Sequence, residues 1–323
     1  MSMDKETFLK AYRIMRTIRD FEYRVSDEFG KGNIPGFLHL YAGQEAVAAG
    51  MCVNLTDEDY IVSTHRGHGH CIAKGGDVGE MMKEIMAREG GSCAAKGGSM
   101  HIAAVEKGML GANAIVGGGP PLIVGATLSA KTLGTDRIGV SFTGDGGSNQ
   151  GTTFEAMNLA VVLKLPAIFL FENNGYGEGT GASYAVGSKD IASRAKGFGM
   201  PALKMDGTDL FDTYATCRKA ADHCRAGKGP IAIEADVIRF RGHFEGDAQA
   251  YRGSNEVKNL MKDRDCLQIA AKRAIKEKLA TRAQLNKIDK DVAALMSTAA
   301  EAALAAPGPS TSELLTDVYA SAY

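Results

Sequence analysis

The sequence predicts an α/β protein built on a doubly wound, mostly parallel sheet. Two short apolar runs, residues 138–143 and 167–171, have the composition of fully buried strands and are separated by a segment with helical character. Two further strand candidates, residues 201–205 and 230–237, enclose a predicted helix at about 210–226. Strands that alternate with helices in this way usually pair in parallel, so we expect helices on both faces of a single sheet.

The N-terminal part of the chain is predicted to be helical from residue 5 to about residue 29. The apolar side chains that recur there at three- and four-residue spacing, as in an amphipathic helix, are Phe8, Tyr12, Met15, Ile18, Phe21 and Val25. Residues 43–53 also have helical character. Residues 60–64 form the first strand candidate, and this strand runs directly into a histidine-rich segment.

The middle of the chain, residues 90–121, is rich in glycine and carries few signals for regular structure. A loop of this length inside a compact domain is usually functional. Helices are expected at about 121–133 and 153–163, on either side of the strand at 138–143. The segment from 255 to about 306 is rich in alanine, lysine and leucine, so we expect two or three helices packed against the sheet.

One domain over residues 1–323, with helical extensions at about 1–55 and 255–323, is the simplest organisation that fits this pattern. Of the 323 residues, 45% are hydrophobic and 23% are charged, as in ordinary globular proteins. The formal net charge of −1 provides no general attraction for nucleic acid or for an anionic membrane. The sequence has no run of about 18 apolar residues and no secretory signal, so we expect no nucleic-acid partner, no membrane partner and a cytoplasmic location.

The most informative motif is Gly144-Asp145-Gly146, at the end of the strand at 138–143. Glycines at a strand end let a phosphate approach the backbone closely. An aspartate between them would repel that phosphate unless a divalent cation neutralised both groups. The motif therefore predicts a cation together with a diphosphate.

A pair of asparagines, Asn173-Asn174, follows the next strand. Ligands of a doubly wound sheet bind at the carboxyl ends of its strands, so Asp145 and Asn174 are expected to lie close together. Carboxylate, amide and carbonyl oxygens suit Mg²⁺, and the carbonyl of Tyr176 is a candidate third ligand. Asp-Gly and Asn-Gly are also common turn signals, which leaves a purely structural interpretation open.

A nicotinamide-nucleotide site is the chemical alternative for the same segment. Gly144 and Gly146 follow a strand, and Glu172 ends the next strand, where a ribose-binding acid would lie. Against this alternative, Asp145 would face a bare pyrophosphate, and Asn149 stands where the third glycine of the G-x-G-x-x-G motif is expected.

The closely spaced histidines His65, His68 and His70 have two interpretations based on their residue type alone. They could form a metal cluster, although zinc usually has four well-placed ligands. They could equally be hydrogen-bonded structural residues near a strand end. The cysteines add no support for zinc, because the sequence contains no C-x-x-C pair.

The segments GDGGSNQG at 144–151 and FENNGYG at 171–177 together resemble the thiamine-diphosphate fingerprint. Further segments resemble the alpha subunit of the thiamine-dependent first component of 2-oxo acid dehydrogenase complexes, and these are residues 36–46, 97–101, 241–243 and 251–252. The similarity extends from about residue 5 to residue 320. It implies the thiamine-diphosphate-binding fold and an oxidoreductase that uses thiamine diphosphate and Mg²⁺.

The resemblance implies a role for each matching position. The cofactor-binding positions that it implies are His65, Arg66, Ala114, Val116, Asp145, Gly146, Gly147, Asn174, Tyr176 and His243. The metal ligands among them would be Asp145, Asn174 and the Tyr176 carbonyl. The catalytic histidines would be His39 and His243, which face the reacting carbon, and His68, which supports the catalytic loop.

Thiamine catalysis also needs a carboxylic acid that hydrogen-bonds the aminopyrimidine ring, and this chain has little room beyond its diphosphate-binding domain to supply one. We therefore expect a beta subunit to supply it. The resemblance implies a heterotetramer of two alpha and two beta chains. It also implies a multienzyme complex in which a lipoyl-bearing dihydrolipoyl acyltransferase receives the product.

The expected small-molecule substrate is acetoin, because residues 109–117 and 242–252 are more similar to the acetoin dehydrogenase type than to the pyruvate type. The implied reaction is oxidative cleavage, in which acetaldehyde leaves and an acetyl unit passes to lipoamide. Pyruvate or another 2-oxo acid is the alternative substrate. A non-catalytic, cofactor-binding scaffold subunit is an alternative from a different functional class.

Overall fold

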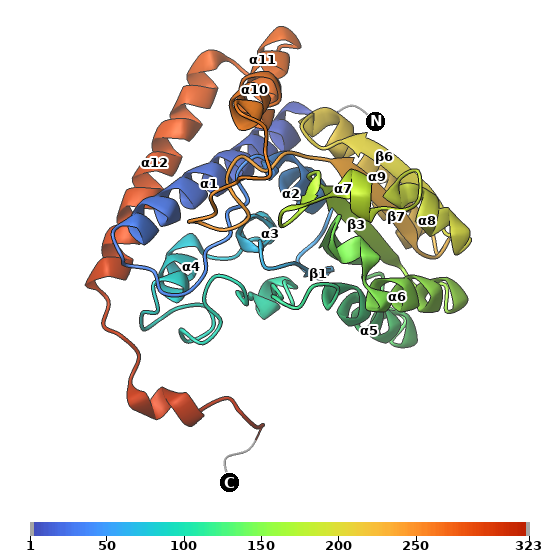
Figure 1. The fold of residues 1–323 in the computed structure, drawn as a ribbon, viewed down its shortest axis with the longest axis horizontal. Coiled ribbons are helices and arrows are strands. Elements are labelled where there is room, and N and C mark those ends of the chain that lie inside the picture. Colours follow the sequence, from blue (N-terminus) through green and yellow to red (C-terminus); the bar gives the residue numbers. More distant parts are fainter. Residues whose placement is uncertain (1–2, 321–323) are drawn as a thin grey trace.

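Five parallel strands form the central sheet of the computed structural model, which describes residues 3–320 (Figure 1). The strand order is β1-β2-β3-β7-β6, and every neighbouring pair is parallel. The strands are β1 (Tyr60–Val62), β2 (Gly139–Gly144), β3 (Ala167–Asn173), β6 (Ala202–Asp206) and β7 (Ile231–Asp236). The predicted parallel sheet is confirmed. A separate antiparallel hairpin, β4 (Tyr176–Gly177) and β5 (Thr180–Gly181), follows β3.

Helices cover both faces of the sheet, as expected for a doubly wound fold. One face is covered by α5 (Gly119–Thr132), α6 (Gly151–Val162) and α8 (Ile191–Gly197), and the other by α9 (Leu210–Arg225). Helices α2 (Glu45–Cys52) and α1 (Lys5–Gly30) share the apolar cluster on the α9 side. In β3, Phe169 and Phe171 pack with α6 and α8, whereas Ile168 and Leu170 pack in the opposite cluster. Successive strand side chains point to opposite faces, so the continuous apolar run in β3 reflects burial on both sides.

The helical extensions pack against each other beside the sheet. The C-terminal segment forms α10 (Glu256–Asp263), α11 (Cys266–Lys276) and α12 (Arg282–Ala305), which confirms the expected number of helices. The expectation that they pack against the sheet is wrong for α11 and α12, whose main contacts are with other helices. α12 lies along α1, and α11 contacts both α1 and α2 (Figure 1). A buried ion network ties the two extensions together, because the guanidinium of Arg19 donates to Glu45 at 2.9 Å and to Asp265 at 3.3 Å.

Two short helices after β1, α3 (His68–Lys74) and α4 (Val78–Ile85), were not predicted, and neither was α8. In α3 the helical signal is weakened by Gly69. A Cβ atom at this position would lie 2.1 Å from the ring of Tyr41, so the packing admits only glycine. The packing of Tyr41, a residue distant in sequence, therefore requires glycine at position 69, although glycine lowers the local helix propensity.

The glycine-rich segment that follows α4 is a loop, as expected. Apart from the 3₁₀ turn η1 (Val105–Lys107) and isolated bridges, the described residues 86–118 form no regular element. Several backbone N–H groups of this loop donate to the buried carboxylate of Glu84 at the end of α4. The loop is thus ordered by specific hydrogen bonds in place of helix or strand pairing.

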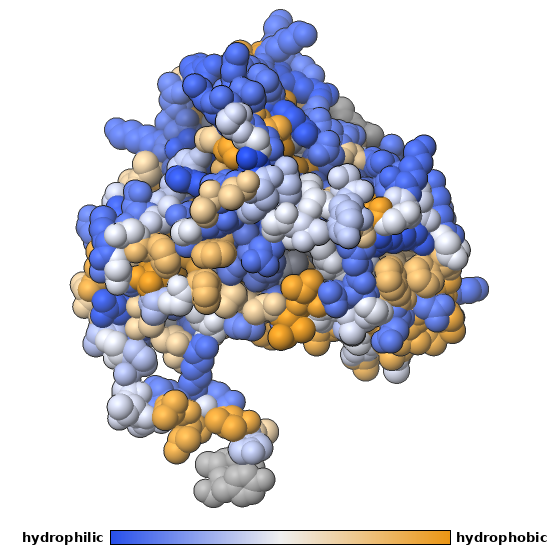
Figure 2. All heavy atoms as spheres, viewed as in Figure 1, coloured by the Kyte–Doolittle hydropathy of each residue, from blue (hydrophilic) through white to orange (hydrophobic). Residues whose placement is uncertain are grey.

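The C-terminal segment beyond α12 leaves the body of the protein (Figure 1). It contains a 3₁₀ turn, η3 (Thr311–Leu315), and Figure 2 shows apolar atoms on it, where Leu314, Leu315 and Val318 are exposed. Every helix within residues 3–320 is too short or too polar to serve as a transmembrane segment.

Candidate active site

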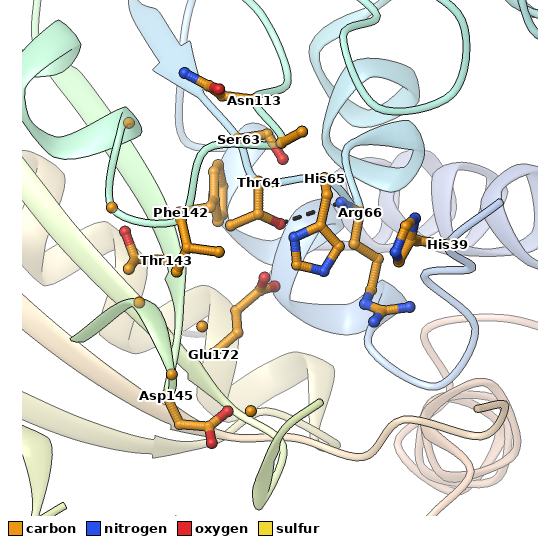
Figure 3. Close-up of a pocket in the computed structure, with 18 of the residues that line it drawn as sticks. His39, Ser63, Thr64, His65, Arg66, Asn113, Phe142, Thr143, Asp145 and Glu172 are labelled. Carbon is orange, nitrogen blue, oxygen red and sulfur yellow. Dashed lines mark hydrogen bonds between the residues drawn. The ribbon is translucent and has the colours of Figure 1, made fainter. Parts of the chain in front are cut away.

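A cavity of about 380 Å³ lies where the carboxyl ends of β1, β2, β3 and β7 meet (Figure 3). Each strand contributes the residues that follow it, because the carboxyl ends of parallel strands share one edge of the sheet. The predicted site residues that line the cavity are His39, His65, Arg66, Ala114, Val116, Asp145, Gly146, Gly147, Asn174, Tyr176 and His243. The structure thus brings together every predicted site residue except His68.

The turn after β2 brings backbone close to the cavity. A Cβ atom on Gly177 would lie 3.1 Å from Cα of Gly146, and one on Gly147 would lie 2.8 Å from Cγ2 of Thr143. The Ser148 hydroxyl donates to the Asp145 carbonyl at 2.6 Å, which fixes the turn. These contacts explain why glycines occupy this turn, and they leave bare main chain facing the cavity.

The carboxylate of Asp145 lies in the cavity and forms no direct ion pair with any of the described residues. Burial raises the pKa of Asp145 to about 6, and weaker contributions from Arg239 and from nearby backbone N–H groups act in the opposite direction. Among residues 3–320, no side chain donates a hydrogen bond to it. A buried carboxylate of this kind is costly unless a cation or a proton neutralises it, so the residue fits a divalent metal ligand.

Asn174 and Tyr176 complete the candidate metal site on the side of β3. The Asn174 side-chain oxygen accepts a hydrogen bond from the backbone N–H of Tyr176 at 3.2 Å. The hydroxyl of Tyr176 donates to Glu256 on α10 at 3.3 Å, and Arg252 stacks on its ring. Because its side chain is engaged by these neighbours, Tyr176 can offer the cavity its backbone carbonyl.

Two buried guanidinium groups, Arg66 and Arg239, border the same cavity. Arg66 donates to the carbonyls of Leu40 at 2.6 Å and His243 at 3.0 Å, and burial together with Arg239 lowers the pKa of Arg66 to about 9. Within the described residues neither arginine forms an ion pair with a carboxylate, and Nε of Arg239 has no partner. Two neighbouring guanidinium groups without a direct ion pair favour an anionic ligand such as a diphosphate.

The sequence reasoning missed Arg239, although it lies just beyond the strand predicted at 230–237 and therefore at the same edge of the sheet. It also missed Gln44 and Glu178 among the lining residues. Gln44 precedes α2 and its side chain approaches that of Asn174 at 3.5 Å, a proximity that only the folded chain creates.

Three histidine rings form a triangle at one end of the cavity. Their centroids are 4.6 Å apart for His39 and His65, 5.1 Å for His39 and His243, and 5.0 Å for His65 and His243. Burial and the charge of Arg66 lower their pKa values, to about 3 for His39, about 2 for His65 and about 4 for His243. All three rings are therefore neutral at physiological pH and can donate or accept hydrogen bonds.

The loop before α5 supplies Ala114 and Val116 to the cavity wall. The side chain of Asn113 accepts a hydrogen bond from the backbone N–H of Ile115 at 2.8 Å, and Gly117 has a positive φ of 82°. This turn holds backbone of residues 114–116 at the cavity.

His68 lies outside the cavity and is completely buried. Its Nδ1 is 3.1 Å from Glu22, and its Nε2 is 3.0 Å from the hydroxyl of Ser99 in the glycine-rich loop. The contact with Ser99 agrees with support of the loop, and the geometry places His68 away from any bound ligand.

His70 is also engaged in internal hydrogen bonds. Its Nδ1 is 2.7 Å from the hydroxyl of Ser63, and its Nε2 is 3.3 Å from the carboxylate of Glu172, which also accepts from Tyr41. Among the described residues, His65, His68 and His70 do not gather into a metal cluster. Glu172 is occupied by protein groups, which weakens the case for a ribose-binding acid.

Comparison with known proteins supports one family. Residues 13–312 match the family described as dehydrogenase E1 component. The alpha subunit of acetoin:2,6-dichlorophenolindophenol oxidoreductase is 51% identical in Cupriavidus necator and 47% identical in Bacillus subtilis, and each alignment covers 99% of this chain and 96% of the relative. The pyruvate dehydrogenase E1 component subunit alpha of Rhizobium meliloti is 39% identical over 97% of this chain and 90% of its own length.

Proposed function

This chain belongs to the dehydrogenase E1 component family, and from that premise we propose that it is the alpha subunit of an enzyme that cleaves acetoin oxidatively. Membership of the family implies thiamine diphosphate as the cofactor. Identities of 51% and 47% to proteins named for acetoin, against 39% to one named for pyruvate, favour acetoin as the substrate. Pyruvate is the second candidate.

The observation that carries the proposal is the unpaired charge in the cavity. Within residues 3–320, neither the carboxylate of Asp145 nor the guanidinium of Arg66 forms a direct ion pair, and the two groups suit a metal-bound diphosphate. In the proposed complex, Asp145, Asn174 and the Tyr176 carbonyl hold Mg²⁺. The arginine and the backbone at Gly146 hold the diphosphate.

The remaining proposed cofactor contacts use other residues that line the cavity. The backbone at Gly147 adds to the diphosphate site, and the backbone at Ala114 and Val116 receives the aminopyrimidine ring. His65, which lines the cavity just beyond β1, is proposed to lie beside the cofactor. When bound, thiamine diphosphate supplies a carbon nucleophile and an electron sink.

The residues of this chain position the substrate and move its protons. His39 and His243 are the proposed catalytic residues that face the reacting carbon, and their neutral rings can exchange protons with substrate oxygens. His68 acts indirectly, as a positioning residue, because it contacts Ser99 in the loop and not the cavity.

A partner chain is part of the proposal. The two relatives named for acetoin are alpha subunits, which implies a beta subunit. Apolar side chains exposed on α5 and α6 are consistent with a surface that a partner covers, and they are Leu122, Leu128, Leu159 and Val162. We propose a heterotetramer of two alpha and two beta chains in the cytoplasm that passes an acetyl unit to a lipoyl-bearing dihydrolipoyl acyltransferase.

The test is reconstitution with the beta subunit. We expect dye reduction with acetoin only when both chains, Mg²⁺ and thiamine diphosphate are present. Faster turnover of pyruvate than of acetoin would replace acetoin with the second candidate. Binding of thiamine diphosphate without turnover of either substrate would instead indicate a scaffold subunit, and calorimetric titration of the same samples would detect that binding.

A further inference from the structure

We propose that His65 is a catalytic residue that accepts the hydroxyl proton of acetoin when the substrate is cleaved. This proposal rests on the function proposed above and assigns a separate task to the third ring of the histidine triangle. One nitrogen atom from each of the three rings lies within 4.8 Å of the other two. Donation of a single proton needs only one of these neutral imidazoles. A hydrogen bond to His243, and the different exposure of His39 and His65, distinguish what each ring can do.

His243 is held as a hydrogen-bond donor. Nη1 of Arg239 lies 3.3 Å from Nδ1 of His243, and a guanidinium can only donate. Nδ1 of the neutral ring must therefore carry the lone pair, and Nε2 carries the proton. This tautomer can give a proton to a substrate oxygen through Nε2, but it has no lone pair there to receive one.

His39 and His65 differ in their access to the cavity. His39 is buried at 7% exposure, and its Nδ1 is enclosed without a partner. His65 is more exposed, lies at the end of β1, and has no hydrogen-bond partner on either ring nitrogen among residues 3–320 (Figure 3). No protein group fixes its tautomer, so one nitrogen of His65 is free to accept a proton from a ligand.

Before an anionic ligand binds, the groups around His65 make its ring a weak base. Burial, Arg66, His39, His243 and Arg239 all lower the pKa of His65, which keeps the ring neutral before the reaction. An anion bound at Arg66 would offset one of these effects and raise the basicity of the ring. A base at this position would therefore be strongest when the anionic cofactor is in place.

Cleavage of acetoin requires two separate proton transfers. The bond that breaks joins the carbonyl carbon to the hydroxyl-bearing carbon, and its electron pair stays with the former carbonyl carbon. The carbonyl oxygen gains negative charge when its carbon is attacked, and Nε2 of His243 can donate to it. The hydroxyl-bearing carbon leaves as acetaldehyde, so its oxygen must lose a proton, which His65 receives. Pyruvate has no such hydroxyl, because it releases carbon dioxide from a carboxylate.

The experiment compares His65→Ala with wild type and with His223→Ala, a histidine on α9 outside the cavity. Each alpha chain is reconstituted with the beta subunit, and binding of thiamine diphosphate with Mg²⁺ is measured by calorimetry. Turnover of acetoin and of pyruvate is then measured with and without imidazole in solution. We expect His65→Ala to reduce acetoin turnover about 100-fold, which is the usual contribution of a general base. The reduction in pyruvate turnover should be smaller by a factor of at least about ten. Imidazole should restore part of the acetoin activity.

Two outcomes would overturn the proposal for His65. One is acetoin turnover in His65→Ala that matches the His223→Ala control. The other is an acetoin loss that imidazole does not rescue and that follows weakened cofactor binding, which would give His65 a structural role only. If wild type itself does not cleave acetoin, the proposed function fails first, and this result is distinguishable because it appears before any variant is compared.

Discussion

The carboxylate of Glu84 accepts a hydrogen bond at 2.8 Å from the backbone N–H of Gly97, which joins the end of α4 to the glycine-rich loop. The same carboxylate accepts from the N–H groups of Cys93 and Ala95 at 2.8 Å and of Gly98 at 3.0 Å. Glu84 is completely buried, so one side chain replaces the backbone partners that this loop lacks. Ser99, which contacts His68, follows directly.

Replacement of Glu84 by Ala should loosen this loop and destabilise the chain. Four buried backbone donors would lose a charged acceptor, and we expect the free energy of unfolding to fall by about 3 kcal/mol. Denaturant unfolding measures the loss, and hydrogen exchange at residues 93, 95, 97 and 98 locates it. Glu89→Ala, at an exposed position five residues on in the same turn region, is the control. Equal protection of these amides in both variants would contradict the assignment.

Asp145→Asn should change how the stability of the metal-free chain depends on pH. Because the folded pKa is raised from 3.8 to about 6, the folded state binds this proton more tightly than the unfolded state. Its contribution to stability is complete below pH 3.8 and is lost as the pH rises through about 6. At about pH 7 the free energy of unfolding of wild type is therefore lower by about 3 kcal/mol, and the uncharged Asn side chain has no such loss.

The measurement is denaturant unfolding of wild type and of Asp145→Asn, both freed of metal with a chelator, from about pH 4 to about pH 7.5. We expect the two curves to separate as the pH rises, with the variant more stable at pH 7. Mg²⁺ with thiamine diphosphate should then stabilise wild type and leave the variant unchanged, because only the carboxylate provides a strong metal ligand. Parallel pH curves, or equal stabilisation by the ligands, would disprove the role of Asp145.

Arg19→Met should destabilise the packing of the two helical extensions. Arg19 is the buried cation between Glu45 on α2 and Asp265 at the start of α11, and its loss leaves two acids facing each other. We expect a loss of about 3–5 kcal/mol in the free energy of unfolding. Arg13 lies on α1 like Arg19 but forms an exposed ion pair with Asp291 on α12, so Arg13→Met should cost less than about 1 kcal/mol. Similar losses in both variants would argue that the buried network is unimportant.

Gly177→Ala should weaken cofactor binding more than it weakens the fold. The added Cβ atom would lie 3.1 Å from Cα of Gly146, so the turn that faces the diphosphate site must shift. We expect the affinity for thiamine diphosphate with Mg²⁺ to fall about tenfold, which corresponds to about 1.4 kcal/mol. Calorimetry provides the measurement. Gly151→Ala, where a Cβ atom meets nothing within 4 Å, should bind as wild type does, and equal binding by Gly177→Ala would refute the argument.

The sequence by itself determined the parallel sheet and the meeting of Asp145 and Asn174, whereas the other candidate site residues followed from the family resemblance. Apolar runs such as residues 167–171 can be buried only between two layers, and Asp145 and Asn174 follow successive strands, so their meeting at one edge is a consequence of parallel pairing. The amphipathic spacing of α1 likewise fixed its buried face. These features depend on local periodicity and on one rule of sheet geometry.

Only the tertiary structure decided the features that depend on contacts between distant segments. In α3, position 69 must be glycine because the ring of Tyr41 leaves no room for a Cβ atom. The donor tautomer of His243 is set by its contact with Arg239. The separation of His68 from the cavity depends on Glu22 and Ser99, which come from different parts of the chain. Hydrogen-bond partners of this kind are set by the packing of whole elements, so residue spacing along the chain does not predict them.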